Sequence, residues 1–155
     1  MKSNLFIALL TIIIASCSNL IDVDSEKTND SKIQSKNHSY ANVDSINTKH
    51  LHLDLKIDFS IKKINGIARH EMQNKGTNKA IFDVKGLKIN KVTTGSSDNE
   101  KNTKFTLGST DQNGVLGQPL IVAIDKNTAY VNIYYETTEE SEALDWLDSA
   151  LTSSK

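Results

Sequence analysis

The chain alternates strictly between polar and apolar residues along one stretch, His50-Leu51-His52-Leu53-Asp54-Leu55-Lys56-Ile57-Asp58-Phe59. Because successive side chains of a β-strand point to opposite faces, this period of two predicts a strand with one apolar and one polar face. We expect the apolar face to pack into a protein core and the polar face to contact water.

Further short apolar segments, separated by turn-forming residues, follow along the chain. The connecting segments are rich in glycine, asparagine, aspartate and serine, as in Gly95-Ser96-Ser97-Asp98-Asn99. Roughly seven or eight short strands of this kind predict an all-β fold, either an antiparallel β-sandwich or a strongly twisted pair of sheets. The expected strands lie at 51–59, 64–72, 80–84, 87–92, 105–107, 120–124 and 129–136.

The segment from Glu139 to Ala150 differs from the strands and predicts a short C-terminal helix. Thr138 or Ser141 is a suitable N-terminal cap, and apolar residues follow in the same segment. Acidic side chains near the start of a helix are stabilised by its dipole. We therefore interpret four acidic residues as a solvated helix face: Glu139, Glu140, Glu142 and Asp145.

The amino terminus has the three zones of a bacterial export signal. Lys2 supplies a positive charge, Leu5 to Ala15 form an apolar run, and small residues precede Cys17. The run is shorter than the roughly 20 residues that cross a bilayer as a helix, which favours a signal helix. The tetrad Ile14-Ala15-Ser16-Cys17 resembles the bacterial lipobox, in which the cysteine is acylated. The alternative is an ordinary secretory signal followed by an unrelated cysteine.

This pattern predicts a lipoprotein signal peptide over 1–16, lipidation at Cys17 and a membrane as partner through that lipid. Cys17 is the only cysteine, so no intrachain disulfide and no cysteine metal cluster can form. The next residue, Ser18, is not the aspartate that often retains lipoproteins at an inner membrane. The expected location is therefore the bacterial cell envelope, lipid-anchored at the outer membrane.

The remainder of the chain divides into a tether and one domain. Residues 17–36 are mostly serine, asparagine, aspartate and lysine, a composition that buries too little apolar surface to offset chain entropy. We expect 17–36 to be a disordered tether and 37–155 to be one β domain. The net charge of −1 leaves no electrostatic footprint for nucleic acid.

Two groups of residues resemble metal sites, and we interpret both as structural. His50 and His52 share one strand face, where two imidazoles can hold a metal, but the same face carries other charged residues and is typical of a solvated surface. The run His70-Glu71-Met72-Gln73-Asn74 begins like the zinc motif H-E-x-x-H, which needs a helix and a second histidine. Because Asn74 replaces that histidine and the segment alternates like a strand, we expect His70 to pack on an inner face.

The order of several short phrases resembles the N-terminal domain of the zinc aminopeptidase family that includes aminopeptidase N. It looks closest to the leukotriene hydrolase branch, and the resemblance extends from about His38 to Lys155. The phrases that carry it are His38-Ser39-Tyr40-Ala41-Asn42, Lys49-His50-Leu51-His52-Leu53-Asp54-Leu55, Ile64-Asn65-Gly66-Ile67-Ala68, Ile81-Phe82-Asp83-Val84-Lys85-Gly86-Leu87, Gly117-Gln118-Pro119-Leu120 and Ile133-Tyr134-Tyr135-Glu136-Thr137.

In that family this domain is a saddle of mixed β-sheets, and the zinc motif and the G-x-M-E-N loop lie in the next domain. Neither motif occurs in this sequence. The resemblance therefore implies a β domain incomplete at its C-terminus, with no catalytic, cofactor-binding or metal-binding residue of its own. Zinc is expected only in the missing catalytic domain, and the open sheet edge left by missing strands is expected to favour aggregation or oligomers.

Two functions remain open at this point. The first is a non-catalytic N-terminal fragment of a lipid-anchored zinc aminopeptidase, whose full-length relative would cleave N-terminal residues from peptides. The second is a free-standing surface lipoprotein β module that binds a peptide or protein partner. On either hypothesis the chain as it stands is expected not to be an enzyme.

Overall fold

We describe the protein from a computed structural model that covers residues 38–142, 144–147 and 149–152. The predicted signal peptide, the lipidation site at Cys17 and the tether up to residue 36 lie outside these described residues. Within the described part, the chain has no helix of sufficient length and apolarity to traverse a bilayer.

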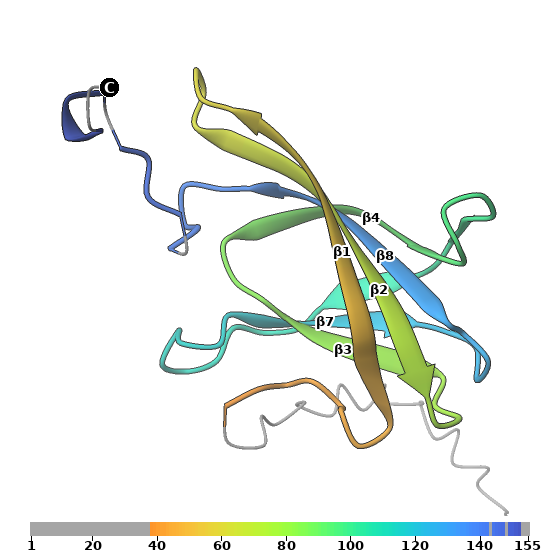
Figure 1. Cartoon of the computed structure of the whole chain (residues 1–155). Helices are drawn as coiled ribbons and strands as arrows, with labels where there is room; N and C mark the ends of the chain where they lie inside the picture. The colour runs from red at the N-terminus through yellow and green to blue at the C-terminus, as the bar shows by residue number, and fades with distance from the viewer. Residues whose placement is uncertain (1–37, 143, 148, 153–155) are drawn as a thin grey trace, which may run out of the picture. The chain divides into compact units, whose positions relative to one another are not determined.

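Eight strands form two antiparallel sheets (Figure 1). The five-stranded sheet has the order β1-β2-β8-β4-β5, and the three-stranded sheet has the order β3-β7-β6. Their bounds are β1 Ile46–Asp58, β2 Lys63–Asn74, β3 Lys79–Val84, β4 Leu87–Thr94, β5 Lys101–Asn102, β6 Phe105–Leu107, β7 Gln118–Ala123 and β8 Tyr130–Thr137.

This architecture confirms the all-β fold predicted from the sequence. All seven predicted strands form, as β1 to β4 and β6 to β8. No sequence pattern predicts β5, because its two residues, Lys101 and Asn102, are polar and too few to show a period. They pair with Thr94 and Thr93 at the far edge of the five-stranded sheet.

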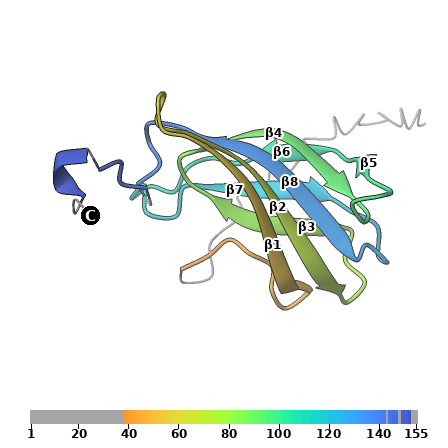
Figure 2. The ribbon, with the colours of Figure 1, turned by 45° about the horizontal axis from the view of Figure 1, so that its top comes forward.

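The core lies between the two sheets (Figure 2). Leu120 and Val122 of β7 are completely buried, and they belong to one cluster with Val92 of β4 and Val131 of β8. Each large apolar side chain buried in this way contributes roughly 1.5–3 kcal/mol to folding. The apolar alternation of β4, β7 and β8 therefore faces the core, as expected.

The apolar face of β1 departs from the prediction. Leu51, Leu53, Leu55 and Ile57 remain 45%, 49%, 43% and 47% exposed. The physical reason is the position of β1 at the outer edge of its sheet, where among the described strands it pairs only with β2. Of its residues, only Ile46 at the start of the strand belongs to the buried core. Figure 1 shows the far end of the β1–β2 hairpin projecting past β3 and β7.

The predicted C-terminal helix over Glu139–Ala150 is wrong for the residues that the structure describes. Residues 138–147, apart from 143, form turns and irregular backbone, and the only regular element is a short 3-10 turn at Ser149–Leu151. Leu147 is 57% exposed, so the burial of apolar surface contributes little free energy that would stabilise a helix here. A short amphipathic segment is marginal as a helix without such packing. Thr138 and Ser141 hydrogen-bond to a neighbouring turn instead.

Candidate functional surfaces

The outer face of the five-stranded sheet carries a polar cluster around Glu100. This residue lies just before β5, and its carboxylate accepts hydrogen bonds from Arg69 Nη1 at 2.6 Å, Thr93 Oγ1 at 2.8 Å and Tyr134 Oη at 2.6 Å. These donors come from β2, β4 and β8, which are neighbouring strands. The Glu100 side chain is only 15% exposed, so the cluster ties the β4–β5 connection down onto three strands.

The electrostatics of this cluster follow from those contacts. Burial alone would raise the pKa of the Glu100 carboxyl, but the hydrogen bonds from Tyr134, Arg69 and Thr93 and the charge of Arg69 lower it overall. Burial and the hydrogen bond to Glu100 raise the pKa of the Tyr134 phenol. Each donor and acceptor is thus satisfied in its ordinary charge state, which is typical of a structural network rather than a reactive site.

A half-open hollow of about 740 Å³ lies at the other end of the same sheet. Lys63 and Lys88 enter it, and both bind the Glu136 carboxylate, at 3.4 Å and 2.7 Å. These two lysines lower the pKa of the Glu136 carboxyl, which they share as a partner. Trp146 lines the hollow as well, and its ring meets Phe59 edge to face with 5.8 Å between centroids. With one carboxylate for two ammonium groups, Lys63, Lys88 and Glu136 together leave a net charge of +1 at the hollow.

The turn at Gly86 fixes the start of the C-terminal segment. The Gly86 carbonyl accepts hydrogen bonds from Thr138 N at 3.0 Å, Thr138 Oγ1 at 3.0 Å and Ser141 Oγ. Its φ of +64° lies in the left-handed region, which glycine adopts without strain. Of the four acidic residues predicted as a helix face, Glu142 pairs with Lys85 at 2.7 Å, and Glu139, Glu140 and Asp145 are exposed. This surface is solvated, although it is not a helix.

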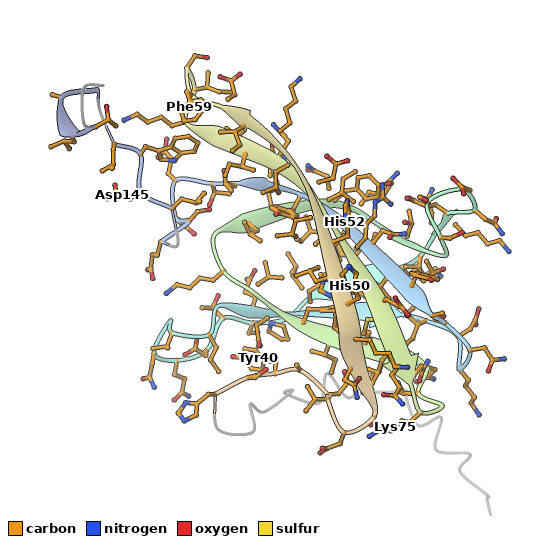
Figure 3. The ribbon with its side chains drawn as sticks, viewed as in Figure 1. Tyr40, His50, His52, Phe59, Lys75 and Asp145 are labelled. Atoms are coloured by element: carbon orange, nitrogen blue, oxygen red, sulfur yellow. The ribbon has the colours of Figure 1, made fainter. Side chains whose placement is uncertain are left out.

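The structure places the histidines where the sequence suggested. His50 and His52 are exposed on the outer face of β1 (Figure 3). The residue opposite His52 on β2 is Arg69, which is cationic and could not serve with the two imidazoles as a third metal ligand. His70 packs inward, with its ring 4.7 Å from that of Phe82 and Nδ1 3.0 Å from Thr48 Oγ1. Burial lowers the pKa of the His70 imidazole. Among the described residues, no group of three or more histidine, cysteine or acidic side chains is arranged to hold a metal ion.

Sequence reasoning missed the Glu100 cluster, because its members are far apart in the chain. Arg69 and Glu100 are separated by 31 residues. The available signal was Arg69 itself, an arginine on the polar face of a strand, which needs an anionic partner when half-buried. Nothing in the loop sequence Ser97-Asp98-Asn99-Glu100 indicates that Glu100 is the anionic partner of Arg69.

Comparison with known proteins gives the sequence relationship. No protein-family model matches the chain. Leucine aminopeptidase 2 of Kluyveromyces lactis is 34% identical over 119 residues, which are 74% of this chain and 17% of that protein. Leukotriene A-4 hydrolase of Xenopus laevis is 31% identical over 124 residues, 76% of this chain and 19% of that protein. The chain is a homologue of the amino-terminal region of these zinc aminopeptidases. It spans less than a fifth of the length of these two relatives.

Solved structures of this zinc aminopeptidase family share the fold. Yeast leukotriene A4 hydrolase in complex with bestatin superposes with a TM-score of 0.64 at 20% identity, over 78% of this chain and 19% of that one. Native leukotriene A4 hydrolase from Saccharomyces cerevisiae gives 0.56 at 18% identity, over 68% and 17%. The resemblance to the leukotriene hydrolase branch that the sequence phrases indicated is therefore confirmed at the level of fold.

Proposed function

We propose that this chain is the non-catalytic amino-terminal β module of a zinc-dependent aminopeptidase, anchored in the bacterial cell envelope by a lipid on Cys17. The observation that carries the proposal is the 34% identity to leucine aminopeptidase 2 over 119 residues. The shared β-sandwich supports it. In this role the module supplies a rigid surface, and the residues that cleave peptides lie elsewhere.

The contacts of the described residues fit a scaffold role. A catalytic zinc needs about three protein ligands and an open position for water. His50 and His52 project from an exposed strand face, and His70 is held by Thr48 and Phe82. The proposal therefore places the zinc chemistry outside residues 38–152. The polar clusters at Glu100 and Glu136 hold neighbouring strands together.

An activity measurement and a chimera test this role. The purified full chain, supplied with zinc, should release no more leucine from a chromogenic leucine amide than a mock preparation does. Substituting residues 38–155 for the matched region of the Kluyveromyces lactis enzyme should give a soluble chimera with measurable aminopeptidase activity. The matched control is the same chimera with Leu120→Lys, which places a charge in the core and should abolish folding. Activity of the chain alone, or a folded chimera without activity, contradicts the proposal.

The lipid anchor is tested separately. Cells grown with a labelled fatty acid should yield labelled wild-type protein in the outer-membrane fraction. Cys17→Ser should remove the label, because no other cysteine is present. Ser25→Ala, a similarly small change in the predicted tether, should keep it. A soluble wild-type protein without label would show that the amino terminus is not a lipoprotein signal.

The free-standing binding module remains the second candidate, and one observation favours it. The apolar face of β1 is exposed along the strand, as a surface that binds another polypeptide would be. The two candidates differ in gene structure. If the DNA downstream encodes the zinc motif in any reading frame, the aminopeptidase proposal is strengthened, and if it encodes none, the free-standing module is favoured.

A further inference from the structure

We propose that two copies of this chain associate edge to edge through β1, in antiparallel register, with a twofold axis at Leu55. Residues His52–Asp58 of one copy would pair with the same residues of the other and join the two five-stranded sheets. This inference is independent of the aminopeptidase proposal, because it rests on the edge, exposure and charge pattern of β1 alone.

The first observation is that β1 is a long open edge. It is the terminal strand of its sheet, and in the described part of the chain its only ladder is with β2. The edge of a sheet presents unpaired backbone donors and acceptors, which natural proteins usually shorten, interrupt or cover. Here the single irregularity lies between Thr48 and His50, at one end of the strand. The ladder from His50 to Asp58 is regular, so that length is available for pairing.

The second observation is the exposed apolar row on the same strand. Leu51, Leu53, Leu55 and Ile57 are all more than two fifths exposed, and Phe59 beyond the strand end is 77% exposed. A contiguous row of large exposed apolar side chains marks an interaction surface. With the axis at Leu55, Leu53 of one copy lies beside Ile57 of the other. The two rows then form one apolar band on a single face of the joined sheet.

The third observation is the charge pattern on the polar face of β1, which is complementary to the same face of a second, antiparallel copy. This pattern favours a second copy of the chain as the partner of the β1 edge. With the axis at Leu55, each Asp54 lies opposite Lys56 of the other copy. Each His52 lies opposite Asp58. Within one copy the charges of Asp54 and Lys56 have no such partner directly across the ladder, where they face Ile67 and Asn65. Opposite charges facing each other across a ladder stabilise pairing, and like charges destabilise it.

Neighbouring registers lack this complementarity. An axis at Asp54 places the two Asp54 carboxylates opposite each other, and an axis at Lys56 places two lysines opposite each other. An axis at Leu55 is flanked on both sides by opposite charges. A shift by one residue in pairing against another strand would also move the apolar row to the other face. The charge pattern therefore specifies the register as well as the partner.

Charge exchange on the full chain tests the proposal by sedimentation velocity over a concentration series. The wild-type chain should dimerise. Asp54→Lys and Lys56→Asp, each of which creates two like-charged pairs across the axis, should each weaken the dimer at least tenfold. The double variant Asp54→Lys/Lys56→Asp restores two opposite pairs and should recover the wild-type dissociation constant. The matched controls, Asp98→Lys and Lys126→Asp, change the net charge equally in exposed loops and should have no effect.

Cysteine cross-linking tests the axis itself, in the full chain with Cys17→Ser so that no other thiol competes. Leu55→Cys places two thiols directly opposite each other at a Cβ separation of about 4.5–5.5 Å, and mild oxidation should give a covalent dimer. Ile57→Cys is the control, because the two thiols are then about 13 Å apart along the strands and should not link. A monomeric wild-type chain, a double charge variant as weak as the singles, or equal linking at both positions would overturn the proposal.

Discussion

The two edge strands β3 and β1 differ in whether another segment of the described chain covers their open side. Along β3, Asn42 accepts a hydrogen bond from Ile81 N at 2.9 Å and donates one to Lys79 O at 3.0 Å. Tyr40 N donates to Asp83 Oδ1 at 2.8 Å, and the Tyr40 side chain is only 8% exposed. Figure 3 shows Tyr40 on the segment that runs beside β3. In the described residues, β1 has no comparable covering segment.

The difference shows that edge protection is supplied by particular contacts rather than by strand composition. Both strands are rich in apolar residues, yet a short preceding segment covers the edge of β3, whereas no described segment covers the edge of β1. A few hydrogen bonds, each worth roughly 1 kcal/mol net, are enough to occupy the backbone groups of an edge strand, so that another chain can no longer pair with them. Substitutions on the covered side should therefore cost more stability than substitutions on the open β1 edge.

The largest effect is expected in the covered region, from Leu120→Ala. Leu120 is completely buried between the sheets. Removing most of its side chain loses transfer energy and leaves a cavity, which typically costs about 2–5 kcal/mol. Chemical denaturation monitored by Trp146 fluorescence or circular dichroism should show this loss. An unfolding free energy within 1 kcal/mol of wild type would mean that the two sheets do not pack as described.

A smaller loss is expected from Glu100→Ala, which removes the centre of the polar cluster on the outer face of the five-stranded sheet. The change leaves Arg69, Thr93 and Tyr134 without their shared acceptor, and stranding partly buried donors costs about 1–3 kcal/mol. The pH dependence gives the sharper test. Because the folded pKa of Glu100 lies below its ordinary value of 4.5, its contribution is present above pH 4.5 and is lost as pH falls below that value.

Glu100→Gln should therefore remove part of the acid sensitivity while it keeps the shape of the side chain. Unfolding curves between pH 3 and pH 7 would show a smaller fall in stability below pH 4.5 than wild type does. The control is Glu71→Gln, an exposed glutamate on β2. If Glu100→Gln and wild type lose stability in parallel with pH, the carboxylate does not act as the hydrogen-bonding centre.

Asn42→Ala should convert the covered edge into an open one. The loss of two hydrogen bonds to β3 is expected to cost about 1–2 kcal/mol. More informatively, the exposed β3 edge should increase aggregation with concentration, as measured by light scattering. Asn113→Ala, an exposed asparagine in a loop, is the control. Unchanged scattering would indicate that the segment before β1 does not protect β3.

The smallest change in monomer stability is expected from Leu53→Ser on the open side. Leu53 is 49% exposed, so the change should alter the unfolding free energy of the monomer by no more than about 0.5 kcal/mol. The measurement belongs at the lowest usable protein concentration, because a dimer adds stability through mass action. A loss comparable with that of Leu120→Ala would show that the β1 row is buried in solution.

The contrast between Leu53 and Leu120 also explains how far the sequence could predict the structure. Alternation is a local property, so it located seven strands and identified His70 as an inward-facing residue. It carries no information about which sheet lies opposite, and β1 has the same pattern as a buried strand. The prediction of a C-terminal helix was wrong for the same reason. Cap residues and apolar spacing were present, but the cap residues Thr138 and Ser141 hydrogen-bond to the Gly86 turn instead.

The order of strands in the larger sheet has a consequence for how the chain folds as it is made. β8 is the last of the described strands in sequence, yet it lies between β2 and β4. The β1–β2 hairpin can form early, but it cannot join β4 until residues 130–137 have been synthesised. Such long-range pairing slows folding, to roughly milliseconds to seconds in small β domains. In the described part of the chain, the five-stranded sheet is therefore completed only after β8 has been synthesised and has paired with β2 and β4.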